Sequence, residues 1–282
     1  MPKPRLNFCV ILPLFFMRLT LAAVAHAEPP LILGVHPYLS ATDLHNRFTP
    51  LVEHLSKRLN RQLTLRISSS YEAHVEAIDS GAIDLALMGP APYVMLTAKA
   101  NPVPLLAAFE SHGSRTFTAI IAVRRDSAIS ELSQLKGKNV ALGPLPSTMS
   151  NIVPRAMLLK AGLAVSQLGK VDYMTNHDNI ALGVLAAAFD AGAMKEDVFH
   201  RYEAQGLRAL ATSEPVADHL FVARRGLDDG LIRELRTSLL SLGETEEGRR
   251  ILTTIQANLT AFLPAHDADY DGLRALIRSL EQ

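Results

Sequence analysis

The chain has 282 residues, of which 48% are hydrophobic, 28 are basic and 28 are acidic. Its formal net charge of zero gives no basic field that would attract nucleic acid or an anionic membrane. The single cysteine, Cys9, lies near the N-terminus, so the rest of the chain forms no disulfide and no cysteine-ligated metal site.

The first 27 residues have the pattern of a secretory signal peptide. Two positive charges lie between Met1 and Arg5, and a mostly apolar run follows that ends in Ala25-His26-Ala27, a small-x-small cleavage pattern. A retained membrane anchor is the alternative, but Arg18 interrupts the apolar run, and a membrane-spanning helix tolerates a central charge poorly. We therefore expect a cleaved, soluble, secreted protein.

Residues 28–282 are enough for one large domain or two modest lobes. The predicted leader contains three of the 28 basic residues and none of the 28 acidic ones, which leaves a net charge of −3. Any anion must therefore be held by locally placed donors. There is no repeat, low-complexity tract or Gly/Ser linker, so two lobes would be joined by crossing segments of the fold.

Short β-rich apolar runs alternate with helical periodicities, which is typical of an α/β protein. In the first part, strands are expected at 31–35, 63–67, 83–88, 104–109 and 117–123. Helices are expected around 48–59, from 71 to 80, and after Gly89-Pro90. In the second part, strands are expected at 138–143, 170–174, 189–194, 207–212 and 219–224, and residues 228–282 should be mainly helical.

The runs FTAIIAVRRD and HLFVARRG are alike, each with an apolar strand, two arginines and a polar turn. We interpret them as the two crossovers of a hinge. The alternative is that the arginines are only solvated surface, where arginine is most often found.

The stretch GPLPSTMSNIVP, between positions 143 and 154, gathers small hydroxyl residues where a strand leads into a helix. Because Pro154 is best tolerated in a first helical turn, we expect the helix to begin near Ser150 or Asn151. Its first backbone N–H groups are then unpaired and carry partial positive charge, which suits an anion. The alternative is that Ser150 only caps its helix. The hydroxyls of this cradle belong to Ser147, Thr148 and Ser150.

Three similar junctions follow other strands. Tyr71 opens a helix behind a serine cap, and Tyr93 lies one turn into the next helix. His177 lies in the first turn of a helix that Thr175 or Asn176 caps. Each side chain alone is as well explained by packing. Because ligands of open α/β folds collect beyond the carboxyl ends of strands, their common placement predicts one cleft with neutral donors for a tetrahedral oxyanion.

Three segments of the chain resemble phosphate/phosphonate-type ABC transporter substrate-binding proteins. They are YEAHVEAIDSGAIDLALMGPAPYV, KGKNVALGPLPSTMSNIVPRAMLLKAGL and NHDNIALGVLAAAFDAGAM, and the similarity spans roughly residues 31 to 240. The resemblance implies an α/β, two-lobed periplasmic-binding-protein fold of type II, in which each lobe is a mixed sheet flanked by helices and a two-strand hinge joins them. By position it implies a ligand held by Tyr71, Tyr93, Ser147, Thr148, Ser150 and His177.

Such a protein closes on a small phosphorus oxyanion (phosphate, phosphite or phosphonate) and delivers it to ABC permease subunits in the inner membrane. We expect a monomer that needs no cofactor, no metal and no nucleic acid. The expected first lobe comprises residues 28–119 and 222–282, and the second comprises residues 120–221.

Two positions depart from the family pattern. Relatives that bind aminophosphonates place an acidic residue just after the Asp-Ala-Gly strand, where this chain reads Met194-Lys195-Glu196-Asp197. A lysine that faces the cleft would repel an ammonium group and attract a second negative charge, whereas one that faces solvent decides nothing. Met149 interrupts the hydroxyl run, although its backbone N–H can still donate.

Three other functions are weighed against transport. The same fold would serve equally in a ligand sensor that acts with a membrane sensor protein. Hydrolysis would need a relay of Ser147, His177 and Asp178, but the nucleophile elbow is absent, and the last two side chains diverge as neighbours at a helix start. A metal site is not indicated, because the early histidines lack ligand spacing. These are His36, His45, His54 and His74.

Overall fold

The computed structural model describes Met1, residues 28–99 and residues 102–281. The predicted signal peptide, apart from Met1, lies outside the described residues, as does Cys9. Among the described helices, none has both the length and the apolar character needed to cross a membrane.

The first lobe is built on a six-stranded mixed sheet. Its strands are β1 (Leu31–Val35), β2 (Leu63–Ile67), β3 (Leu85–Met88), β4 (Leu105–Glu110), β12 (Leu220–Ala223) and β13 (Ala261–Leu263). Their order is β13-β4-β12-β3-β1-β2. β1 pairs in parallel with β2 and β3, whereas β12 runs antiparallel to β3 and β4.

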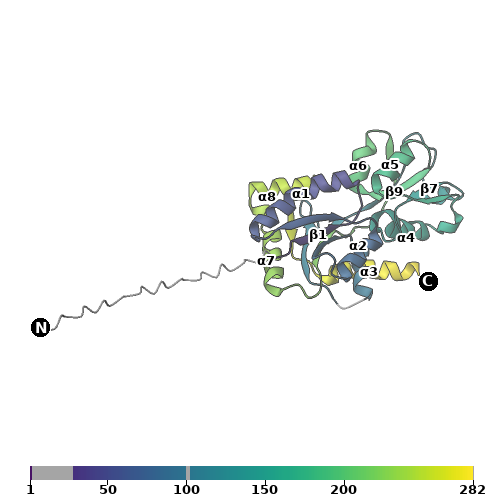
Figure 1. The fold of residues 1–282 in the computed structure, drawn as a ribbon. Helices are drawn as coiled ribbons and strands as arrows, with labels where there is room; N and C mark the ends of the chain where they lie inside the picture. Colours follow the sequence, from purple (N-terminus) through teal and green to yellow (C-terminus); the bar gives the residue numbers. More distant parts are fainter. Residues whose placement is uncertain (2–27, 100–101, 282) are drawn as a thin grey trace.

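Helices cover both faces of this sheet, with α1 and α8 on one side of β1 and α2 and α3 on the other (Figure 1). These helices are α1 (Ala41–Arg58), α2 (Tyr71–Asp79), α3 (Pro90–Lys99), α7 (Asp229–Leu240), α8 (Glu246–Ile255) and α9 (Asp271–Leu280). Short 3₁₀ turns lie at Leu242–Glu244 and Asp267–Tyr270. Because both faces are covered, the central strands are continuous apolar runs, and all four residues of β3 and of β12 are buried.

The second lobe is built on a five-stranded sheet with the order β10-β6-β9-β7-β8. Its strands are β6 (Ala119–Arg124), β7 (Val140–Leu142), β8 (Val171–Tyr173), β9 (Ala191–Lys195) and β10 (Leu207–Thr212). Its helices are α4 (Val153–Lys160), α5 (His177–Leu185) and α6 (Glu196–Glu203), with 3₁₀ turns at Leu132–Leu135 and Val165–Gln167 and a π-helical turn at Thr148–Ile152. β6 runs antiparallel to both of its neighbours.

A two-stranded antiparallel sheet, β5 (Thr116–Phe117) with β11 (Val216–Ala217), joins the lobes. The chain leaves the first sheet after β4 and returns to it at β12, so the crossovers precede the two double-arginine strands that were predicted to form them. The predicted lobe boundaries, after residues 119 and 221, stay a prediction. Ala119 pairs in the second sheet, and Leu220 and Phe221 pair in the first.

Several local expectations were wrong. β13 was not predicted, because Ala-Phe-Leu is a short run inside an otherwise helical tail, and pairing with β4 supplies its stability. The helical start after β7 was placed too late. Ser147, and not Ser150, caps the π-helical turn, and α4 continues from that turn with Pro154 in its first turn. The first helix, expected around 48–59, already begins at Ala41, and the two-residue strand β11 was not predicted. The remaining predicted strands and helices match the structure to within a few residues.

Candidate functional site

A narrow cavity with about 270 Å³ of empty volume lies between the two lobes. Four of the six side chains predicted to hold the ligand line it, namely Tyr71, Ser147, Thr148 and His177. These residues come from three separate strand–helix junctions, one in the first lobe and two in the second. Their position beyond the carboxyl ends of strands, from which they were predicted to share a cleft, therefore does bring them together. Contact with a ligand stays a prediction.

The Ser147 turn depends on the close approach of two backbone segments. Gly143 follows β7, and its N–H donates to the carbonyl oxygen of Ser150 at 2.8 Å. A β-carbon at position 143 would lie 1.8 Å from Ser150 Oγ, so only glycine fits there. Ser150 itself does not line the cavity. Its hydroxyl lies 2.6 Å from Ser147 Oγ and fixes the side chain that does.

Thr148 joins the two lobes at the mouth of α3. Its Oγ1 accepts a hydrogen bond of 2.9 Å from the backbone N–H of Ala91, an N–H at the start of α3 that has no partner within its own helix. A hydroxyl that accepts one bond can still donate its own hydrogen. The N–H groups of Thr148 and Met149 begin the π-helical turn, so they too have no intrahelical acceptor.

His177 is a neutral hydrogen-bond donor. Asn176 caps α5, as one of the two predicted caps, and places the imidazole in the first turn. His177 Nδ1 accepts a bond of 3.1 Å from the backbone N–H of Lys195, so the ring hydrogen lies on Nε2. Burial, and next the positive charge of Lys195, lower the pKa of His177 to about 3. At neutral pH the ring is therefore uncharged.

Lys195 faces the cavity, and its side chain is almost fully buried. Its Nζ donates to Gln256 Oε1 of the first lobe at 2.8 Å and lies 3.3 Å from Asp197 Oδ1. Burial alone would raise the pKa of Asp197, but the charges of Lys195 and Arg201 hold it below its ordinary value. A buried ion pair therefore lies beside the cavity, and its ammonium group also bridges the lobes.

Tyr93 does not line the cavity. Its hydroxyl donates to Asp267 Oδ1 at 2.5 Å, and its ring packs edge-on against Tyr270 with centroids 4.9 Å apart. The rotation of α3 therefore turns this side chain toward a 3₁₀ turn of its own lobe.

Sequence reasoning missed other lining residues, which are His36, Tyr38, Gly89, Phe117 and His219, while it left the orientation of Lys195 open. His36 and Tyr38 follow β1, so the strand-end rule that selected Tyr71 was also available for them. Phe117 belongs to the hinge strand β5, and His219 immediately precedes β12. No pattern in the sequence marks these two, because strand pairing between distant segments brings them to the cavity.

The Ser147, His177 and Asp178 relay is not assembled. The Asp178 carboxylate pairs with Arg201 at 3.0 Å, while His177 Nδ1 is occupied by the Lys195 N–H. A histidine in a hydrolytic triad instead donates from that nitrogen to a carboxylate. In the part of the chain that the structure describes, no group of three His, Cys, Asp or Glu side chains is placed to hold a metal ion.

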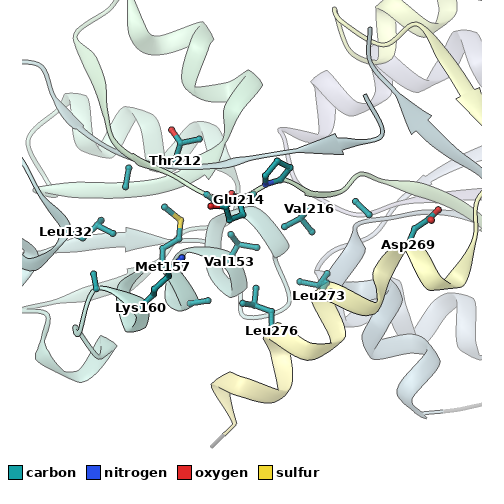
Figure 2. Close-up of a pocket in the computed structure, with 17 residues that line it drawn as sticks. Leu132, Val153, Met157, Lys160, Thr212, Glu214, Val216, Asp269, Leu273 and Leu276 are labelled. Carbon is teal, nitrogen blue, oxygen red and sulfur yellow. The ribbon is translucent and has the colours of Figure 1, made fainter. Parts of the chain in front are cut away.

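A larger groove, with about 1350 Å³ of empty volume, opens at the back of the hinge (Figure 2). Val153 and Met157 of α4 form one wall, and Leu273 and Leu276 of α9 form another. Its lining is mainly apolar. The smaller cavity is therefore the better candidate for a polar ligand.

Comparison with known proteins agrees with this geometry. Residues 33–270 match the model of the family described as "ABC transporter, phosphonate, periplasmic substrate-binding protein". The chain belongs to this family. It is 24% identical to the phosphate-import protein PhnD of Mycolicibacterium smegmatis over 267 residues, which cover 86% of this chain and 83% of that protein.

Solved structures share the fold. The 1.52 Å structure of PhnD1 from Prochlorococcus marinus with methylphosphonate superimposes with a TM-score of 0.81 at 22% identity, and the match covers 89% of this chain and 98% of that one. The aliphatic sulphonate binding protein SsuA from Escherichia coli gives a TM-score of 0.61 at 17% identity, with 90% and 94% covered. The two-lobed periplasmic-binding-protein fold expected from the sequence is confirmed.

The buried histidines should make the protein acid-sensitive. Burial lowers the pKa of His36 well below 6.5, that of His74 to about 4 and that of His177 to about 3. The unfolded chain therefore binds more protons below pH 6.5, and stability is lost as the pH falls through that range. Each histidine should contribute up to about 1.4 kcal/mol per pH unit. Urea unfolding between pH 7.5 and 5 measures the free energy of unfolding as a function of pH. In His74→Gln the slope of this curve at its acid end should correspond to one proton fewer than in the parent protein. An unchanged slope would contradict this account.

The Ser147 turn should not tolerate a side chain at position 143. Gly143→Ala forces the added methyl group into Ser150 Oγ, and we expect a loss of about 1–3 kcal/mol in the free energy of unfolding. The control is Gly272→Ala in α9, where a β-carbon has no neighbour within 4 Å and should be neutral or slightly stabilising. Equal melting temperatures for the two variants would refute the close-approach argument.

Proposed function

We propose that this protein is the periplasmic receptor of an ABC transporter and captures a small phosphorus oxyanion such as phosphate, phosphite or a short phosphonate. The observation that carries the proposal is the convergence of uncharged donors from both lobes on one narrow cavity. Hydroxyl, imidazole and backbone N–H donors placed this way suit a tetrahedral oxyanion without any global positive charge. Membership of the phosphonate-transporter family supports the same ligand class.

The size of the cavity favours a ligand with little or no organic substituent. The space between its lining side chains is only about 270 Å³ even with the part open to solvent included, which leaves little room beside a tetrahedral head group. The side chains around it are also held by packing and hydrogen bonds, as Ser147 is by Ser150. A long substituent would require the lobes to remain apart.

Lys195 argues against aminophosphonates. Its ammonium group occupies the cavity, where an incoming ammonium would meet a like charge in a place with little solvent screening. A phosphorus oxyanion with two negative charges gains from the same group. We propose that the ligand has no cationic substituent, and that Asp197 holds Lys195 in position.

Three hydrogen bonds between the lobes suggest how binding drives closure. The backbone N–H of Ala91 donates to Thr148 Oγ1, and the backbone N–H of His177 donates to the carbonyl oxygen of Tyr38. The third bond runs from Lys195 Nζ to Gln256 Oε1. These contacts exist only when the lobes meet. A ligand held from both sides adds to them, so it binds the closed state more tightly than the open one and shifts the population toward it.

The protein would act by binding alone. The Asp178 carboxylate is committed to Arg201, which leaves His177 without the carboxylate partner that a hydrolytic relay needs. We propose that the protein is a monomer and carries its ligand unchanged to permease subunits in the inner membrane. Membership of an ABC-transporter family supports the permease partner. No feature of the described residues favours a sensor role over transport.

A ligand screen tests the proposal. Phosphate, phosphite, methylphosphonate, aminoethylphosphonate and sulfate would be compared by thermal shift, where a hundredfold excess over Kd stabilises by about 2.7 kcal/mol. Thr148→Val removes a hydroxyl from the cavity and should weaken the best ligand by about 10- to 100-fold, as expected for one charge-assisted hydrogen bond. The control is Thr254→Val, on the exposed side of α8. Stabilisation by none of the phosphorus oxyanions would overturn the proposal.

Lys195→Met should weaken discrimination against a cationic ligand. Two unit charges about 6 Å apart at an effective dielectric of about 20 repel by about 3 kcal/mol. We therefore expect the preference for methylphosphonate over aminoethylphosphonate to fall by at least tenfold, measured by calorimetric titration of both ligands. Lys170→Met is the matched control, because Lys170 pairs with Asp172 at the protein surface. A preference that survives in the Lys195 variant would remove this residue from the specificity account.

A further inference from the structure

His36 presents a hydrogen-bond acceptor to a cavity that otherwise offers mainly donors. Its Nδ1 lies 3.1 Å from the backbone carbonyl oxygen of Leu87. A carbonyl can only accept, so Nδ1 carries the hydrogen, and in the neutral ring Nε2 carries a lone pair. None of the described residues forms a hydrogen bond with Nε2. His177 has the opposite arrangement, because its Nδ1 accepts and its Nε2 donates.

The position of His36 directs this lone pair away from the sheet. The residue follows β1, is 1% exposed and lines the cavity. Nδ1 is held by the neighbouring strand β3. Nε2, on the opposite side of the ring, lies close to Gly89, 3.6 Å from the position that a β-carbon of this residue would occupy. Gly89 lines the same cavity just beyond the carboxyl end of β3.

The surroundings keep the His36 ring neutral. Burial first, and then the nearby His219 and His74 rings, lower its pKa well below the ordinary value. The His219 ring is stacked on it, with centroids 5.6 Å apart and an interplanar angle of 6°. The other titratable groups that contact the ring or line the cavity with it are Tyr38, Tyr71, His177 and Lys195.

We propose that His36 selects phosphorus oxyanions that carry a hydroxyl hydrogen, which the ligand P–OH group donates to His36 Nε2. This inference rests on the proposed function and names the ligand form that the site takes. An oxyanion without such a hydrogen would place a lone pair of its own against that of Nε2, or would need a proton from solvent. Sulfate has the same tetrahedral shape but is fully ionised at neutral pH, so it should bind at least a hundredfold more weakly than phosphate.

Phosphate and methylphosphonate differ in the number of hydroxyl hydrogens, and this difference tests the proposed role of His36. Methylphosphonate loses its last hydroxyl hydrogen in its second ionisation, whereas phosphate has one more and keeps a P–OH group as the dianion. Above the second pKa of methylphosphonate, its binding must take up one proton for each molecule bound, and its affinity should fall tenfold per pH unit. Phosphate affinity should not show that fall.

The experiment measures Kd for phosphate and methylphosphonate by calorimetry between pH 6.5 and 9.5. The ratio of the two affinities removes every effect of pH on the protein that both ligands share. In the parent protein we expect the ratio to rise about tenfold per pH unit in favour of phosphate above the second pKa of methylphosphonate. Titrations in two buffers with different ionisation enthalpies should show about one proton taken up with methylphosphonate and none with phosphate.

Two variants assign the effect. His36→Gln supplies an amide that can turn its NH₂ group toward the ligand, so the pH dependence of the ratio should flatten and the rejection of sulfate should fall at least tenfold. His74→Gln is the matched control. His74 is equally buried and also bonds to the Leu87 carbonyl oxygen, at 2.9 Å, but it does not line the cavity. It should keep the parent ratio and the parent rejection of sulfate.

The outcomes separate this inference from the proposed function. A parent protein that binds neither phosphorus oxyanion overturns both. Tight binding with a pH-independent ratio, or with sulfate bound as tightly as phosphate, overturns only the acceptor role. A His36→Gln variant that retains the full pH dependence overturns the assignment to His36. The stacked His219, whose Nδ1 lies 2.8 Å from the Asp218 carboxylate, would then be the acceptor.

Discussion

The arrangement of the site depends on one hydrogen bond across the cleft, from the Ala91 N–H to Thr148 Oγ1. A helix start in the first lobe has an unpaired N–H, and a hydroxyl of the second lobe satisfies it. The same hydroxyl belongs to the turn whose residues Ser147, Thr148 and Met149 line the cavity. In the proposed site, Thr148 therefore takes part both in the closure of the lobes and in the donor set.

Burial, more than net charge, determines the electrostatics of this cavity. Desolvation keeps His36 and His177 uncharged, so each ring offers one fixed donor or acceptor and not a diffuse positive charge. Lys195 supplies a local cation beside the cavity, and Asp197 pairs with it. A protein with no positive field can therefore still hold an anion, provided that its donors are fixed before the ligand arrives.

The sequence was sufficient for the fold and for part of the site. Apolar runs and helix caps in the sequence indicated where strands end and helices begin. These positions correctly predicted that Tyr71, Ser147 and His177 lie at one cavity. It could not place Tyr93, because the direction of a side chain one turn into a helix depends on how that helix packs. His219 is placed by the pairing of β12 with the distant strand β4, where the Phe109 N–H donates to its carbonyl oxygen, and this pairing leaves no local signal.

Tetrahedral oxyanions such as phosphate and sulfate have the same shape but differ in the number of hydroxyl hydrogens that they carry. A site with a hydrogen-bond acceptor can distinguish them by this number. The tautomers of His36 and His177 are opposite because different backbone groups hold their Nδ1 atoms, a carbonyl in one case and an N–H in the other. The backbone of β3 and of β9 therefore sets the polarity of two otherwise identical side chains. Since backbone groups in a sheet cannot reorient without breaking it, this pattern is as rigid as the fold itself.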